Sequence, residues 1–486
     1  MRYTFKLCLN ITWVLLLVLG TVALPLAGMD REAMAGNDGW TIPVEISTNA
    51  KAWSPSLTVD SKGIVHAVWL GASDPNPPAA GDTIYYCRWN GIEWSEPVDV
   101  FVSAVQRNLG SPVIRAHPDD KLYVVWRGRS GMIYLSTAPA AVAELVRQWT
   151  PPRIILEGAN FTYDLDLESD RSGLLHLAFV QEFAGVSVIT YSRSDDGGQT
   201  WARPAQISDS KTDTLAWNPR VAIGKDGTIH ATWAEVPLPG TWPPQGVLYA
   251  RSIDDGQTWS VPFQVAEEGY GRANVGLSDE RTVHLVWSGT VGWEGRYHIR
   301  SADGGQTWSE IARLPGLQES FGTSFSEMVV DDTGVLHLAA GVNQQRYLTW
   351  KDGVWSLPEK IADVIPDRAL VREGGMPRIE LTEGNRLIVL YHDNWNIFFA
   401  TRLVDAPHWP IPTAVPALPS MPDSRSGSSE LTPSVLPTAI PLPPFDNPAA
   451  TRPSATSSIR ALIFGTVPVL LLLVGVVLYR TSCLRK

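Results

Sequence analysis

Ser194 to Trp201 reads Ser-Asp-Asp-Gly-Gly-Gln-Thr-Trp, and this stretch decides how the chain is organised. The frame Ser-x-Asp-x-Gly-x-Thr-Trp returns at Ser252–Trp259 and at Ser301–Trp308. Each copy lies between two short strand-like runs, which predicts a hairpin turn. The Asp can accept hydrogen bonds from the turn's own amides, and the Gly permits a positive φ where the chain reverses. The Trp then enters the next strand, where its ring can wedge between neighbouring sheets.

A second repeat runs through the chain from Gly39 to Val404. It consists of an apolar run, a turn with Asp or Gly, and an apolar stretch that usually contains His and ends in an aromatic residue. Seven units begin near Ser54, Ser111, Tyr163, Asn218, Arg272, Phe325 and Pro377, at spacings of 52 to 57 residues. The third strands of these units are predicted at Thr83–Arg88, Met132–Ser136, Val188–Ser192, Val247–Arg251, Tyr297–Arg300, Arg346–Trp350 and Ile397–Thr401. Four strands repeated seven times predict an all-β fold, a seven-bladed β-propeller.

The last unit stops after its third strand, because a Pro-rich segment follows at once. Gly39–Ile46 resembles the fourth strand of another unit, Gln257–Val265. We therefore expect the N-terminal strand to complete the last blade, which would close the ring and remove an open sheet edge.

The repeated turn resembles the Asp-box, or bacterial neuraminidase repeat, of the sialidase superfamily. That resemblance implies a β-propeller in which the boxes are structural and lie on the face opposite the active site. The matching residues are Asp196, Gly198, Trp201, Asp254, Gly256, Trp259, Asp303, Gly305 and Trp308. Sialidases are usually six-bladed, so seven units depart from the family pattern.

Both ends of the chain carry apolar segments. Residues 1–35 read as a signal peptide or an N-terminal anchor, with Arg2 and Lys6 beside an apolar run. Residues 461–479 carry no charge and are long enough for a transmembrane helix, and the basic tail 480–486 follows. Residues 405–458 are rich in Pro, Ser and Thr and predict an extended stalk. We expect a single-pass protein of the cell membrane, with the propeller, residues 39–404, on the extracellular side.

Composition narrows the choice of partner. The 486 residues are only 18% charged and carry a formal net charge of −11, which argues against nucleic acid. Cys87 is the one cysteine of the predicted propeller, so no disulfide can form within it. We expect a monomer whose partner is a glycan or a surface protein, with the C-terminal helix in the membrane.

Five histidines occupy equivalent positions in the repeat: His66, His176, His230, His284 and His337. Residues spread one to a blade would not converge on one ion unless they lined the axis. We therefore expect them to be structural, with each ring hydrogen-bonded to a neighbouring blade. No metal or cofactor is expected.

Candidate functional residues lie in the loops between second and third strands and in the segments that enter each unit. The candidate catalytic residues are Glu182, Glu235, Tyr391 and Asp393, and the candidate substrate-binding residues are Arg127, Arg272, Arg296, Arg372, Trp53, Trp217 and Trp293. Aromatic rings and planar hydrogen-bonding groups suit sugars, whose C–H faces stack on rings while their hydroxyls take polar partners.

The resemblance to sialidases implies three arginines that hold the substrate carboxylate, a Tyr nucleophile assisted by Glu, and an Asp acid/base. This chain lacks the early Arg-Ile-Pro motif, and Trp53-Ser54-Pro55 stands in its place. Tyr391 can equally be the repeat aromatic of its strand. Three hypotheses remain: a carbohydrate-binding propeller without a recognisable catalytic set, an exo-α-sialidase-type glycoside hydrolase, and a non-catalytic protein-binding or assembly propeller.

Overall fold

A computed structural model gives the structure of the chain. It describes residues 39–47, 51–72, 81–103, 109–128, 131–157, 165–183, 185–209, 211, 213–237, 246–266, 273–289, 294–317, 325–341, 344–363 and 375–409. The predicted signal segment 1–35, the membrane helix 461–479, the tail 480–486 and all but the start of the stalk lie outside these residues. Within them, no helix is long and apolar enough to cross a membrane.

The described chain is all-β, as predicted, and its strands form successive antiparallel groups. Sheet 1 contains β2 (Ala52–Val59), β3 (Val65–Gly71), β4 (Thr83–Trp89) and β5 (Val98–Val102). Sheet 2 contains β6 (Val113–His117), β7 (Lys121–Arg127), β8 (Ile133–Pro139) and β9 (Arg153–Leu156), with the short 3₁₀ helices η2 (Ala140–Val142) and η3 (Val146–Gln148) before β9. Sheet 3 contains β10 (Leu165–Ser169), β11 (Leu175–Phe183), β12 (Val186–Ser194) and β13 (Ala205–Gln206).

The remaining groups repeat this order. Sheet 4 contains β14 (Thr214–Ile223), β15 (Ile229–Pro237), β16 (Gly246–Ser252) and β17 (Phe263–Ala266), and a parallel pairing of β12 with β14 joins it to sheet 3. Sheet 5 contains β18 (Asn274–Leu277), β19 (Val283–Ser288), β20 (Arg296–Ser301) and β21 (Ala312–Arg313). Sheet 6 contains β22 (Ser326–Val330), β23 (Leu336–Gly341), β24 (Gln344–Lys351), β25 (Val354–Trp355) and β26 (Glu359–Asp363). Sheet 7 contains β27 (Gly375–Thr382), β28 (Arg386–Asp393), β29 (Asn396–Leu403) and, from the N-terminus, β1 (Val44–Glu45).

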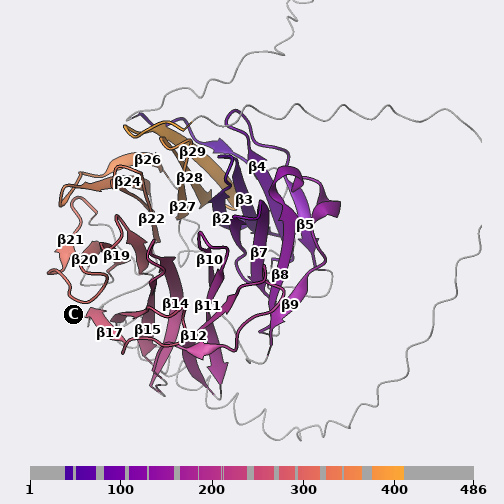
Figure 1. Ribbon diagram of the computed structural model, residues 1–486. Coiled ribbons are helices and arrows are strands. Elements are labelled where there is room, and N and C mark those ends of the chain that lie inside the picture. The colour runs from indigo at the N-terminus through magenta and orange to yellow at the C-terminus, as the bar shows by residue number, and fades with distance from the viewer. Residues whose placement is uncertain are drawn as a thin grey trace, which may run out of the picture. The chain divides into compact units, whose positions relative to one another are not determined.

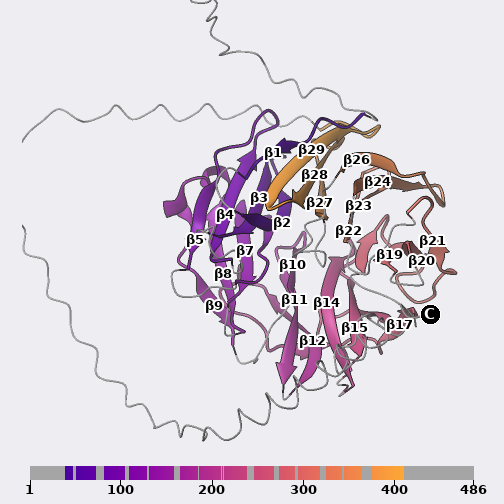
Figure 2. The same ribbon diagram turned by 180° about the vertical axis from the view of Figure 1, so that it is seen from behind.

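The first strand of each sheet faces a common centre (Figures 1 and 2). These inner strands contact one another in succession, from β2 through β6, β10, β14, β18 and β22 to β27, and β27 contacts β2. Strand β1 pairs with β29 at Val44–Phe399, so the predicted pairing of the N-terminal stretch with the last unit is confirmed. The seven predicted third strands overlap β4, β8, β12, β16, β20, β24 and β29.

The repeated turn folds as its sequence predicts. In the second copy, Asp254 accepts hydrogen bonds from Ser252 Oγ at 2.8 Å, from Thr258 N at 2.9 Å and from Thr258 Oγ1 at 2.6 Å. These donors stabilise the ionised carboxylate and lower the pKa of Asp254 to about 2. Gly256 has a φ of +79°. The first and third copies make the same set of hydrogen bonds.

Each turn also fastens its sheet to the preceding one. The Trp259 ring of sheet 4 lies 5.3 Å from the Tyr191 ring of sheet 3, at 68° to it. Tyr191 Oη is in turn 2.8 Å from His176 Nδ1. Three further boundaries repeat this His–Tyr–Trp series, at His66–Tyr86–Trp149, His230–Tyr249–Trp308 and His337–Tyr347–Trp40. The series packs the Trp of one sheet against the Tyr of the sheet before it.

The His–Tyr–Trp series corrects the expectation that each histidine ring bonds a neighbouring blade. Their role is structural, but each of these four rings bonds a Tyr on the third strand of its own sheet, and the neighbouring sheet supplies the Trp instead. In sheet 5 the partner of His284 is His298, whose Nδ1 accepts a hydrogen bond from Trp355 of sheet 6 at 3.1 Å. Antiparallel pairing sets second and third strands side by side, so the His reaches the nearest hydroxyl within its own sheet.

We expect Gly256→Ala to destabilise the protein by roughly 2–4 kcal/mol, because a Cβ there would lie 2.0 Å from Tyr191 Cε1 and would also sit at a positive φ. Gly227→Ala is the matched control in the same sheet. Its φ is +83°, but nothing lies within 4 Å of its Cβ position, so about 1–2 kcal/mol is expected. Thermal unfolding of both variants measures the difference. Equal losses would show that contact with Tyr191 is unimportant.

Acid should weaken the boundaries between sheets. Burial lowers the pKa of His230 to about 4, so this ring stays neutral in the fold while the unfolded chain takes up its proton near pH 6.5. Its contribution to stability is therefore complete above pH 6.5 and is lost as pH falls toward 4, by on the order of 3 kcal/mol at about 1.4 kcal/mol per pKa unit. Unfolding free energies at several pH values should show a shallower slope for His230→Gln than for wild type. His408→Gln, which alters an exposed ring, should keep the wild-type slope.

Candidate functional site

The inner strands enclose a cavity of about 1040 Å³ at the centre of the sheets. One end of this cavity is lined by the turns between first and second strands, at Asp170–Ser172, Gly224–Gly227, Ser278–Glu280 and Asp331–Gly334. In antiparallel sheets these turns lie at the same end as the repeated Asp turns, and we call it the turn end. The opposite end, with the connections between second and third strands, is the loop end.

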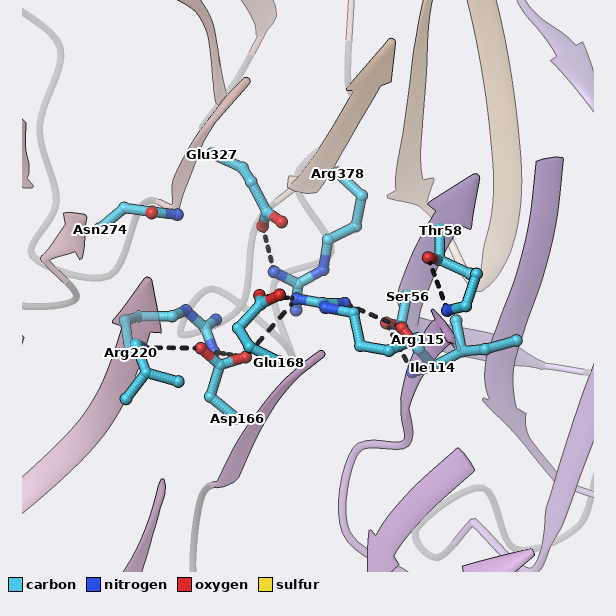
Figure 3. Close-up of polar contacts among 12 residues, drawn as sticks. Ser56, Thr58, Ile114, Arg115, Asp166, Glu168, Arg220, Asn274, Glu327 and Arg378 are labelled. Carbon is cyan, nitrogen blue, oxygen red and sulfur yellow. Dashed lines mark hydrogen bonds and ion pairs between the residues drawn. The ribbon is translucent and has the colours of Figure 1, made fainter. Parts of the chain in front are cut away.

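Polar side chains on the inner strands satisfy the backbone of the next inner strand. Ser56 Oγ accepts a hydrogen bond from Ile114 N at 3.2 Å, and Thr58 Oγ1 accepts one from Ala116 N at 3.0 Å. Asp166 Oδ2 accepts one from Val221 N at 3.0 Å (Figure 3). An inner strand has a free edge toward the centre, and these side chains supply partners that no further strand can offer.

Of the charged residues that line the cavity, three arginines and four carboxyl groups belong to the inner strands and the others to the turns. Arg115 donates to Glu168 Oε1 at 2.6 Å, and Arg378 donates to Glu327 and, at 2.8 Å, to Pro55 O (Figure 3). Arg220 is held less firmly, because its nearest carboxylate oxygen, Asp166 Oδ1, lies 3.8 Å away. Arg115 and Arg378 are therefore each paired with a carboxylate of a neighbouring inner strand.

The fourth carboxyl group, Glu380 on β27, makes no ion pair within the described residues. Burial raises its pKa to about 8; Arg115 opposes the rise, whereas Glu327 and Glu168 add to it. Burial also raises the pKa of Glu168, against the influence of Arg115. Glu380 is thus a neutral carboxylic acid at pH 7, which can donate a hydrogen bond into the cavity.

The sequence interpretation did not identify these cavity residues. It sought chemistry in the loops between second and third strands and in the segments that enter each unit. The available signal was a charged side chain at the middle of an otherwise apolar strand, as in Leu165-Asp-Leu-Glu168 and Arg378-Ile-Glu380. Such residues indicate a strand whose side chains reach a water-filled centre.

The predicted catalytic residues lie at the loop end but on different sheets. Glu182 is near the end of β11, and Glu235 on β15 pairs with Lys211 at 2.8 Å. Tyr391 on β28 is 2% exposed and packs on Phe398 in the core, which agrees with its reading as the repeat aromatic of its strand. Burial raises the pKa of Tyr391. Asp393 lies at the hairpin between β28 and β29.

The predicted binding arginines and tryptophans are also distributed around the loop end. Arg127 ends β7, and Trp217 is half-buried on β14. Arg296 begins β20 and is 2% exposed; its guanidinium donates to Ser326 Oγ at 3.0 Å, and burial lowers its pKa to about 10. Arg272, Arg372 and Trp293 lie outside the described residues.

Trp53 lies in an aromatic pair that the structure assembles from the two ends of the fold. The Trp53 ring on β2 is 5.5 Å from the Trp395 ring, at 85° to it, and both are half-buried. Lys51 Nζ lies 5.0 Å from the centre of the Trp395 ring. Trp395 is in the β28–β29 hairpin turn, where Ala52 N donates to its carbonyl oxygen at 2.7 Å. We call Trp53, Trp395 and Lys51 the aromatic platform.

The backbone around the platform is strained. Asn394 and Trp395 have φ of +46° and +67°, a turn that normally holds Asn-Gly. Ser54, which follows Trp53 and precedes Pro55, has a φ of +53°. Asn218, between Trp217 and Pro219, repeats this with a φ of +61°. Bulky residues and residues before proline disfavour these conformations, which cost about 1–3 kcal/mol each and are often kept at binding sites.

The described residues contain no group of three or more His, Cys, Asp or Glu side chains placed to hold a metal ion. No known family model matches the chain, and no curated protein matches it either.

Solved structures do resemble it. A PL25 ulvan lyase, solved bound to -[GlcA(1-4)Rha3S]-, has a TM-score of 0.53 at 14% identity, over 74% of this chain and 95% of the lyase. A Dyadobacter fermentans protein of unknown function has a TM-score of 0.49 at 14% identity, over 76% of this chain and all of its own. The NanB sialidase of Streptococcus pneumoniae has a TM-score of 0.42 at 14% identity, over 78% of this chain and 71% of the sialidase. The likeness to the lyase shows a shared fold alone, and the two lower scores support no inference.

Glu380 and Glu327 should respond oppositely to amide substitution. Because the pKa of Glu380 is raised in the fold, wild type loses stability as pH rises from about 4.5 to 8. We expect Glu380→Gln to be more stable than wild type at pH 9 and equal to it below pH 4.5.

Glu327→Gln should instead cost roughly 1–3 kcal/mol at pH 7, because it leaves Arg378 without its carboxylate. Chemical denaturation at pH 4.5, 7 and 9 distinguishes the two variants. A Glu380→Gln variant that is less stable than wild type at pH 9 would show that the fold does not raise the pKa of this carboxyl group.

Proposed function

We propose that the protein is a carbohydrate-binding propeller without catalytic activity, and that it binds glycans at the aromatic platform. The single observation that carries this proposal is the pair of half-buried rings of Trp53 and Trp395, which meet edge to face at the loop end. A ring that is open on one face can stack on the C–H face of a pyranose, while nearby polar groups bind its hydroxyls. Lys51 and Asp393 are the charged groups nearest in the chain to the two rings.

The strain in the turn supports a binding role. Trp395 stands where a glycine would be favoured, so its ring is presented at a cost in backbone energy. A purely structural turn would gain stability from glycine. The packing of Trp395 on Trp53 holds the Trp395 ring in a fixed orientation, which reduces the entropy lost when a sugar stacks on it.

The catalytic alternatives receive less support. A sialidase-type mechanism needs a Tyr nucleophile within reach of Glu, but Tyr391 is buried on sheet 7 while Glu182 and Glu235 belong to sheets 3 and 4. Two arginines of the central cavity, Arg115 and Arg378, are already paired with carboxylates. An assembly propeller would present a flat face, whereas the inner strands enclose a large cavity.

We infer that the seven sheets are the seven blades of a closed propeller, because their inner strands contact one another in succession and β27 contacts β2. We further propose that segment 461–479 anchors this domain in the cell membrane. The Pro-rich segment 405–458 would then hold it away from the lipid on the extracellular side. The proposals of a closed propeller and of a membrane anchor can each be wrong without affecting the proposal for the aromatic platform.

Trp395→Gly gives the sharpest test of the platform. It relieves the strain at a positive φ, so we expect unchanged or higher thermal stability together with at least a tenfold loss of glycan affinity. A glycan array probed with the full-length protein would first find the ligand, and calorimetric titration would then give the affinities.

Trp409→Gly is the control, because Trp409 is 58% exposed and lies beside the β27–β28 turn at the other end of sheet 7. It should leave glycan binding unchanged. No array binding by wild type, or equal affinity for wild type and Trp395→Gly, would overturn the proposal.

A further inference from the structure

The central cavity offers a second place for a ligand, apart from the platform. It is bounded by the inner strands and the turn end, whereas Trp53 and Trp395 lie at the loop end. Its volume of about 1040 Å³ is at the upper end of the range for small-molecule sites. Among the described residues that line it, none is aromatic, so stacking contributes nothing there.

Two groups in the cavity have hydrogen-bonding capacity left over. The Arg220 guanidinium makes no hydrogen bond within the described residues, and its nearest carboxylate oxygen, Asp166 Oδ1, is 3.8 Å away and belongs to a group that already binds Val221 N. The Glu380 carboxyl has no guanidinium partner there. Arg115 and Arg378, by contrast, are each bound to a carboxylate and to a backbone carbonyl. Arg220 therefore needs acceptors from something else.

The charged groups that line the cavity limit which class of ligand can bind there. With Glu380 protonated, the three arginines are balanced by Asp166, Glu168 and Glu327, so a ligand with net charge would upset a neutral wall. At the turn end, carboxylates from four turns, including Asp170, Asp226, Asp279 and Asp331, outnumber the basic residues Arg171 and Lys225. An anion is repelled at this rim, and inside, where the charges of the wall balance, a charged ligand of either sign finds no net charge to offset its lost hydration.

We propose that the central cavity binds a neutral polyhydroxylated molecule, a sugar or polyol, with the Arg220 guanidinium donating to its oxygens and the carboxylates of Glu168 and Glu327 accepting from its hydroxyls. A hydroxyl both donates and accepts, so one such ligand satisfies a wall on which donors and acceptors alternate. The Glu380 carboxylic acid donates a further hydrogen bond. The site does not depend on glycan binding at the platform.

The test compares three ligands of equal ring size, D-glucose, D-glucuronate and D-glucosamine, by calorimetric titration of the full-length protein at pH 7. Glucose should bind more tightly than either charged analogue. Arg220→Met should weaken it by tenfold or more, and Arg220→Lys, which keeps the charge but not the planar fork, should fall between. A neutral-sugar panel with galactose, mannose and inositol covers the case in which the stereochemistry of glucose does not fit.

One further variant and a stability measurement separate this site from the platform and from misfolding. Trp395→Gly should retain cavity binding, because Trp395 lies at the loop end, beside Trp53. Thermal unfolding confirms that Arg220→Met and Arg220→Lys are folded. Tighter binding of glucuronate or glucosamine than of any neutral probe, binding that Trp395→Gly abolishes, or no binding by the whole panel at millimolar concentration would each overturn the proposal.

Discussion

The contact between a Trp of one sheet and a Tyr of the sheet before it is the interaction on which the other features depend. A single four-stranded sheet buries too little apolar surface to be stable alone, so each must pack against two neighbours. The Trp308 and Tyr249 rings, 4.8 Å apart, show how this is done. The Asp turn fixes where Trp308 leaves the hairpin, and the hydrogen bond between His230 Nδ1 and Tyr249 Oη fixes the Tyr249 ring. Turn chemistry and sheet packing are thus one device.

Other segments of the chain can supply the aromatic ring that packs between two sheets when the Asp turn is absent. In sheet 2 the Asp turn is absent, yet Trp149 reaches Tyr86 of sheet 1 from behind two 3₁₀ turns, with its Nε1 bound to Ala143 O. At the boundary between sheets 6 and 7 the N-terminal Trp40 performs this role on Tyr347. What is kept is the ring between the sheets, and the Asp turn is one of several ways to position it.

The all-β succession of four-stranded groups could be predicted from sequence because local turn chemistry and a regular spacing specify it. Ser-x-Asp-x-Gly-x-Thr-Trp determines a hairpin within eight residues, and the strand predictions came from the second repeat, with its spacing of 52 to 57 residues. The candidate site could not be predicted in this way. Arg115, Asp166 and Arg378 lie more than 50 residues apart in sequence, and only the packing of the inner strands brings them to one cavity. Likewise Trp395 was visible as a loop residue, but its contact with Trp53 depends on how the last sheet meets the first.

The two ends of the sheets differ in how their backbone is stabilised, and this difference bears on where we propose the binding site. At the turn end the backbone is satisfied by its own Asp and Ser side chains, and the positive φ angles there fall mostly on glycines. At the loop end non-glycine residues, Ser54, Asn218 and Trp395, hold left-handed conformations, and the Asn218 amide nitrogen has no hydrogen-bond partner within the described residues although it is buried. The turn end also has non-glycine residues at positive φ, such as Asp120 and Asp255, but Ser54 and Asn218 precede proline and Trp395 is bulky, so the conformation costs more at the loop end. The repeated turn end therefore builds the fold, and the loop end is where we propose that the aromatic platform binds its ligand.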